Sequence, residues 1–202
     1  MRKQPIYFLI DTPLSMIGEP ILYFHKIISE FISLEKQNPQ AIETFHICII
    51  GSNTVEAEII LPLTTISEII NLSSFKCQGK SNIFKGIEIL KNLVKNEVTK
   101  TTYEKKGDWK PILFLLVGTI PQIDIIQYGL DFLNKSFSSG YYASGSINDY
   151  SGLIQTSKLS SPNILYYKNE YVGNYFKKTF RNVENTENID FYYLSKHFNW
   201  VS

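Results

Sequence analysis

Cysteine is scarce in this sequence, which has only two, Cys48 and Cys77, in 202 residues. Cys48 falls in an apolar, strand-like run and Cys77 in a polar stretch, so the pair predicts neither a disulfide framework nor a zinc site. A chain without a disulfide framework is typical of a reducing compartment. We therefore expect a cytoplasmic protein.

Long apolar runs and a strong net charge are also missing. Five apolar residues, 6–10, precede the first acid, which is too few for the core of a signal peptide. No stretch approaches the roughly 18 apolar residues that a membrane-spanning helix needs. The 20 basic and 19 acidic residues leave a net charge of +1, which gives no reason to expect nucleic-acid or membrane binding.

Recognisable catalytic patterns are absent from the sequence. The three histidines, His25, His46 and His197, are far apart and lack the spacing of paired metal ligands. No G-x-S-x-G motif surrounds a serine that would serve as a nucleophile. Because nothing supplies an acid–base pair or an activated nucleophile, we expect that the protein is not an enzyme.

What the sequence does contain is a series of apolar runs that predict strands. These runs cover residues 5–10, 44–51, 54–61, 111–117 and 163–168. The first and fourth are nearly continuous in Ile, Leu, Val and Phe, which indicates central strands covered on both faces. Only Ser52 and Asn53 separate the second run from the third, which predicts a hairpin with 54–61 at the edge of the sheet.

Between these runs, apolar residues recur at the three- to four-residue spacing of amphipathic helices. The clearest patterns cover 20–36 and 83–100. Three further helices are expected over residues 125–137, 171–180 and 192–201. The stretch 138–162, rich in Ser, Gly and Tyr, is interpreted either as a long surface loop or as hiding a short strand around Leu153 and Ile154.

The alternation of strands and helices predicts the fold class. We expect one α/β domain over residues 1–202, a three-layer α/β/α sandwich. Its doubly wound sheet would be mostly parallel, with one antiparallel edge hairpin. In such a sheet the loops that leave the carboxyl ends of central strands meet at one crevice.

Three loops are expected to meet there. The first carries Asp11 and Ser15, the second is the stretch 77–82, and the third, 117–121, contains Thr119. Their acid and hydroxyl side chains mark the crevice as the candidate functional site.

Several separated segments together form a recognisable pattern. They are 5–11, Gly18-Glu19-Pro20, Pro62-Leu63-Thr64, Lys100-Thr101-Thr102, Gly107-Asp108-Trp109-Lys110-Pro111 and Phe198-Asn199-Trp200-Val201-Ser202. With these segments the chain resembles a von Willebrand factor A (VWA) domain, and more narrowly the TerY-type proteins associated with bacterial tellurite-resistance loci. The similarity covers nearly the whole chain and is weakest over 138–190. It implies a VWA fold, a bacterial stress-response context, and protein partners of the kinase or phosphatase type.

The resemblance also implies a metal-ion-dependent adhesion site for Mg²⁺ or Mn²⁺. By position, Asp11, Ser15 and Ser81 retain oxygen donors of that site. Pro13 has no side-chain oxygen where the family has a hydroxyl, and Gly118 stands where the family has an aspartate. We therefore expect a degenerate site with weak or lost affinity for a divalent ion.

Lys80 directly precedes Ser81, where the resembled family usually has glycine. One hypothesis is that its ammonium reaches Asp11 and replaces the missing cation with a salt bridge. The alternative is an ordinary solvated lysine.

The motif Gly107-Asp108-Trp109-Lys110-Pro111 also has two interpretations. An exposed tryptophan would mark it as a partner-binding signature. The structural interpretation has Gly107 end a helix, Trp109 pack at the bottom of the sheet, and Pro111 open a strand.

These observations together predict a non-enzymatic protein–protein interaction module. The alternatives are a small-molecule or nucleotide-binding protein that uses the same crevice, and a structural subunit whose site has decayed. The residues expected to mediate the interaction are Asp11, Ser15, Lys80, Ser81 and Thr119.

Overall fold

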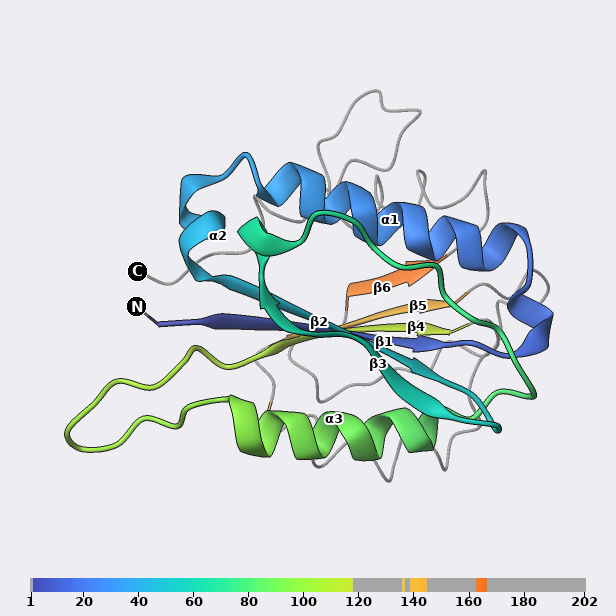
Figure 1. Ribbon diagram of the computed structural model, residues 1–202. Helices are drawn as coiled ribbons and strands as arrows, with labels where there is room; N and C mark the ends of the chain where they lie inside the picture. The colour runs from blue at the N-terminus through green and yellow to red at the C-terminus, as the bar shows by residue number, and fades with distance from the viewer. Residues whose placement is uncertain (1, 118–135, 137–138, 145–162, 167–202) are drawn as a thin grey trace.

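The computed structural model describes residues 2–117, 136, 139–144 and 163–166. Within these residues, six strands form one sheet in the order β3-β2-β1-β4-β5-β6 (Figure 1). All neighbouring pairs are parallel except β2 and β3, which are antiparallel. The strands are β1 (Gln4–Asp11), β2 (Phe45–Ser52), β3 (Ala57–Thr65), β4 (Ile112–Val117), β5 (Ser139–Ser144) and β6 (Asn163–Tyr166).

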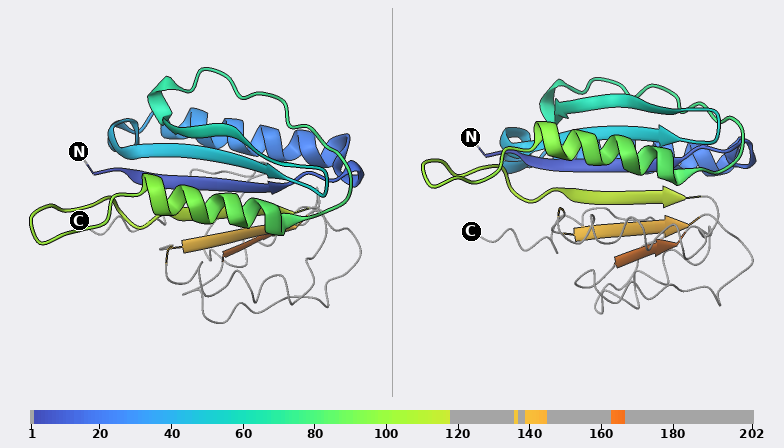
Figure 2. Two further views of the ribbon diagram at one scale, coloured as in Figure 1. Left: turned by 60° about the horizontal axis from the view of Figure 1, so that its bottom comes forward. Right: turned by 90° about the horizontal axis from the view of Figure 1, so that it is seen from below.

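Helices cover both faces of this sheet. The long helix α1 (Glu19–Glu35) and the short α2 (Pro39–Thr44) lie on one face, and α3 (Ile83–Glu97) lies on the other (Figure 1). Figure 2 shows the three layers from two further directions. The predicted three-layer α/β sandwich with a mostly parallel sheet and an antiparallel edge hairpin is therefore confirmed. None of the helices that the structure describes combines the length and apolarity needed to cross a bilayer.

Strand β1 is buried along its whole length because both of its faces are covered. Its side chains alternate between two cores, as the period of a strand requires. Ile6, Phe8 and Ile10 pack with α1, while Tyr7 and Leu9 pack with α3. The nearly continuous apolar run thus marks a central strand, as the sequence predicts.

The apolar stripe of α1 is the one that its spacing predicts, with Ile21, Phe24, Ile28 and Phe31 buried. The helix begins one residue earlier than expected, after Gly18, whose φ of 96° favours glycine. Helix α3 ends three residues before the predicted boundary. The short helix α2 was not predicted at all, because it contributes little apolar periodicity.

The antiparallel hairpin exists, but its second strand begins three residues later than the sequence predicts. The turn occupies residues 53–56, and its shape comes from one side chain. Asn53 Oδ1 accepts hydrogen bonds from the amides of Val55 at 2.8 Å and Glu56 at 3.0 Å. An asparagine that bonds its own backbone in this way lengthens the turn and delays the strand.

The stretch 138–162 contains a strand, but not at the expected position. Strand β5, Ser139–Ser144, pairs in parallel with β4 on one side and β6 on the other. Its sequence has no apolar run, so pairing between two neighbours rather than periodicity defines it. Leu153 and Ile154 lie outside the described residues, as do the helices expected over 125–137, 171–180 and 192–201 apart from helical Ser136.

The motif that begins at Gly107 follows the structural interpretation in two of three details. Trp109 is half-buried, and the Arg2 guanidinium carbon lies 5.0 Å from the centre of its ring. Pro111 directly precedes β4. Gly107 does not end a helix, because α3 ends at Glu97, and it instead lies buried against residues 99–101.

Candidate functional site

Asp11, the last residue of β1, forms the centre of the strand-end site. Its side chain is buried, and the residue is 1% exposed. The Ser81 hydroxyl donates a hydrogen bond of 2.5 Å to Asp11 Oδ2. The structure therefore brings together one residue from each of the first two predicted loops.

Backbone hydrogen bonds hold these two loops against each other. The amide of Gln78 donates to the carbonyl of Thr12 at 3.0 Å, and the amide of Leu14 donates to the carbonyl of Gly79 at 3.0 Å. Gly79 has a φ of 56°, which lets the second loop turn here. The crossing of the loops is thus fixed by the main chain and not only by side chains.

Ser52, at the end of β2, is a residue of the site that sequence reasoning missed. It is the register partner of Asp11 in the neighbouring strand. Its hydroxyl donates to the carbonyl of Asn82 at 2.5 Å and accepts from the amide of Gly86 at 2.9 Å. Ser52 therefore satisfies an amide in the first turns of α3 and joins that helix to the sheet. The strand-end rule applied to β2 would have indicated this residue.

Thr12 and Asn53 extend this network and were also missed. The Thr12 hydroxyl donates to the carbonyl of Ser52 at 3.2 Å and accepts from Asn53 Nδ2 at 3.1 Å. Both residues are about 2% exposed or less. The buried polar groups at the ends of β1 and β2 thus bind one another and stiffen the floor of the site.

Lys80 is positioned by its main chain. Its amide donates to Thr54 Oγ1, and its carbonyl accepts from the Thr54 amide, both at 2.8 Å. In the part of the chain that the structure describes, the ion pairs are Lys26–Glu30 and Lys91–Glu88. The proposed Lys80–Asp11 salt bridge is therefore wrong, and Ser81 occupies the partner position on the carboxyl group instead.

Of the hydroxyl residues predicted for the site, Ser81 is the one that the structure shows hydrogen-bonded to Asp11. Ser15 is exposed in the short 3₁₀ helix Leu14–Met16, which follows extended Pro13. Thr119, Gly118 and the rest of the third loop lie outside the described residues.

Burial controls the electrostatics of this site. Loss of solvation raises the pKa of Asp11, and the hydrogen bonds from Ser81 and from the Asn82 backbone offset only part of that rise. Among the described residues, nothing donates a hydrogen bond to Asp11 Oδ1. Burial and the nearby Asp11 charge also raise the pKa of the half-buried Cys77 thiol.

The described donors do not fit a divalent metal ion. Mg²⁺ requires about six hard oxygen ligands in octahedral geometry. Here the described residues bring together one carboxylate, Asp11, and one hydroxyl, Ser81, far fewer oxygen ligands than that geometry needs. They also contain no group of three or more His, Cys, Asp or Glu side chains arranged to hold a metal.

Three exposed apolar residues lie in the first loop and in the turn between β2 and β3, and we call them the apolar rim. They are Leu14, Ile17 and Val55, which are 56%, 62% and 58% exposed. Leu14 bonds the carbonyl of Gly79, and a Cβ added to Gly79 would lie 2.9 Å from Val55 Cγ2. Leu14 and Val55 therefore lie beside the Gly79 turn, and the amide of Ile17 bonds the carbonyl of Leu14.

The sequence matches no protein-family model, and no curated protein is similar to it in sequence. Solved structures are similar in fold. The crystal structure of the SpRpn10 VWA domain is 11% identical, with a TM-score of 0.59 over 91% of this chain and all of that one. Proximal thread matrix protein 1 from the mussel byssus is 13% identical, with a TM-score of 0.52 over 88% of this chain and 45% of that one. The chain has the fold of a von Willebrand factor A domain.

Proposed function

We propose that this domain binds a partner protein at the strand-end site and does so without catalysis. The observation that carries the proposal is the apolar rim. Scattered exposed apolar residues are ordinary, but three on adjoining segments, two of them beside the Gly79 turn, make a surface of the kind that partners cover. Leu14, Ile17 and Val55 are each more than half exposed.

The polar residues of the site have separate roles in this proposal. Ser15, Lys80 and Ser81 are exposed and contact the partner. Asp11 is 1% exposed, too little for a partner to reach, so its role is to hold Ser81 and the second loop in position.

The two described histidines support a non-catalytic role because both are engaged away from Asp11. His25 Nε2 lies 3.3 Å from the carbonyl of Leu72, and His46 lies between Thr44 and Thr65. The interaction in this proposal is also independent of metal, because the described donors do not fit Mg²⁺ or Mn²⁺.

Site-specific photo-crosslinking tests the proposal. A photoactivatable residue replaces Ser15 at the site or, as the control, exposed Glu43 in α2, which lies at the end of the sheet where β1 and β2 begin (Figure 1). We expect one crosslinked partner from position 15 and none from position 43. Excess wild-type protein should compete for that product, whereas excess Leu14→Ser/Ile17→Ser protein should not.

Equal crosslinking from both positions would contradict the proposal. Chelation with EDTA should leave the product unchanged. If EDTA abolished the product and Mn²⁺ restored it, the site would bind metal despite Pro13, and the metal-independent form of the proposal would be wrong.

The finer context stays a prediction from the sequence. The TerY-type subfamily, the tellurite-resistance or stress-response setting, and kinase- or phosphatase-like partners come from the resemblance, whereas the cytoplasmic location comes from the scarce cysteines and the short N-terminal apolar run. Mass spectrometry of the protein crosslinked through position 15 tests the partner class directly.

A further inference from the structure

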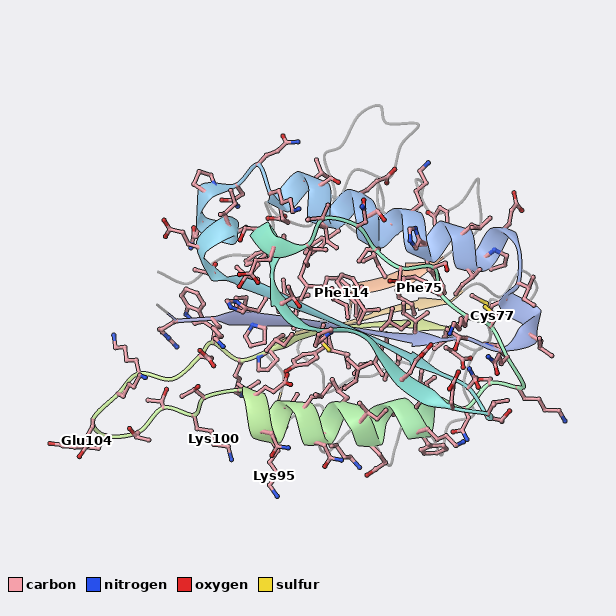
Figure 3. All side chains as sticks on the ribbon, viewed as in Figure 1. Phe75, Cys77, Lys95, Lys100, Glu104 and Phe114 are labelled. Atoms are coloured by element: carbon pink, nitrogen blue, oxygen red, sulfur yellow. The ribbon has the colours of Figure 1, made fainter. Side chains whose placement is uncertain are left out.

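Residues 99–108 form an exposed loop between α3 and β4 that we call the basic finger. It projects from the end of the sheet where β1 begins, opposite the end that carries the strand-end site (Figure 1). Lys100 and Glu104 are labelled on it in Figure 3, with Glu104 at the far tip. Nothing in the strand-end interaction uses this loop.

Positive charge is concentrated here. Residues 95–110 and the two residues before β1 carry seven basic and three acidic side chains, a formal charge of +4 against +1 for the whole chain. Two of the acids face inward, since Asp108 bonds backbone amides and Glu97 Oε2 is buried. The basic residues are Arg2, Lys3, Lys95, Lys100, Lys105, Lys106 and Lys110.

The base of the finger is firmly built. Asp108 accepts hydrogen bonds from the amide of Thr99 at 2.8 Å and the amide of Lys3 at 3.0 Å, and its own amide donates to the Thr99 carbonyl. Burial alone would raise the pKa of Asp108, but these hydrogen bonds hold it below its usual value, so the carboxylate stays charged at neutral pH. Arg2 Nε donates to the Gly107 carbonyl at 2.7 Å.

The outer part of the finger is ordered by further hydrogen bonds. The Thr102 amide donates to the Lys105 carbonyl at 2.9 Å, and the Gly107 amide donates to Thr101 Oγ1 at 3.0 Å. Tyr103, between these bonds, is fully exposed. An exposed aromatic ring on a hydrogen-bonded loop that also carries Lys100, Lys105 and Lys106 has the composition and the low ordering cost of a binding hot spot.

We propose that the basic finger is a second docking surface, which binds an acidic segment of a partner protein. Lysine ammonium groups would pair with carboxylates of that segment, and the Tyr103 ring would pack against its apolar parts. A nucleic acid fits less well, because one exposed ring offers a single stacking platform and the whole chain has almost no net charge.

Binding of a fluorescein-labelled decaglutamate peptide, followed by anisotropy in 150 mM salt, tests this surface. Lys105→Glu/Lys106→Glu should weaken binding about tenfold or more, since two attractive charges become repulsive. The matched control is Lys26→Glu/Lys76→Glu, which makes the same charge change on exposed residues that belong neither to the finger nor to the proposed strand-end contacts. It should change the affinity by less than about twofold.

Zero-length carbodiimide coupling of the same peptide, mapped by mass spectrometry, locates the contact on the native protein. We expect products at Lys100, Lys105 and Lys106 in preference to Lys76 and Lys80. The proposal is overturned if the two charge variants lose affinity equally, if wild-type protein shows no saturable binding, or if a dT20 oligonucleotide binds more tightly than the peptide. None of these results bears on the position-15 crosslink.

Discussion

Gly86 lies in α3 where the helix comes closest to the sheet, and replacing it with alanine should destabilise the protein. A Cβ at this position would collide with Leu9 Cδ1 and lie 2.9 Å from Ser52 Cβ. Leu9 is completely buried, so its side chain has no space into which to move. The Gly86 amide also donates the hydrogen bond that Ser52 accepts.

Opposing effects decide the size of the change. Overpacking a core by one methyl group costs about 1–3 kcal/mol. Distorting the Ser52–Gly86 hydrogen bond costs about 1 kcal/mol more. The better helix propensity of alanine stabilises the folded protein by about 1 kcal/mol and offsets part of this loss. We therefore expect Gly86→Ala to lower the free energy of unfolding by about 2 kcal/mol, with the crowding outweighing the propensity.

Urea unfolding followed by circular dichroism measures this loss, and thermal unfolding should show a midpoint lower by about 4–8 °C. The control is Asn92→Ala at an exposed position of the same helix, which should be neutral or slightly stabilising. If Gly86→Ala matched this control, helix propensity would dominate and the close approach of α3 to β1 and β2 would be refuted.

Three further changes test the site and the finger. Asp11→Asn should stabilise the protein at pH 7. Burial raises the folded-state pKa of Asp11, so the stability that the protonated carboxyl provides is lost as pH rises through that pKa. Urea unfolding at pH 4 and pH 8 should show this loss in the wild type and not in the variant. Ser81→Ala should cost about 1–2 kcal/mol at pH 7, because it removes the Oδ2 hydrogen bond of a buried carboxyl group whose Oδ1 already lacks a donor. An unchanged urea midpoint would contradict this. Gly107→Ala should lower the free energy of unfolding by about 2 kcal/mol or more, because the alanine Cβ would collide with main-chain atoms of Thr99 and Thr101, which cannot rotate away as a side chain can. Amide hydrogen exchange should then become faster across residues 99–108 and stay unchanged in β2.

The central strands could be predicted from the sequence because a strand that is buried on both faces needs apolar residues at nearly every position. Strands β1 and β4 are nearly continuous apolar runs, and each is almost entirely buried. Strand β5, with the sequence Ser-Gly-Tyr-Tyr-Ala-Ser, has neither an apolar run nor a regular alternation of apolar and polar residues. Its place between β4 and β6 depends on long-range pairing that a local pattern does not contain.

The candidate site could be predicted in outline for a similar reason. Topology alone brings the carboxyl ends of parallel strands together, so the meeting of Asp11 and Ser81 follows from the order of the strands. The roles of Ser52 and Asn53 could not be predicted in this way, because they depend on the side-chain bonds of one particular turn. The predicted Lys80–Asp11 salt bridge was wrong because a lysine's place in the sequence does not show how the loop is folded. Hydrogen bonds to Thr54 fix the main chain of Lys80 instead.

The parallel arrangement of β1 and β4 has a consequence for how this domain would assemble with others. Each strand begins near the basic finger and ends near the apolar rim, and six residues of β4 span roughly 20 Å. Two proteins bound at these opposite ends of the strands would not overlap. A single small domain would then join two partners in a defined orientation, and the length of its strands would set the distance between them.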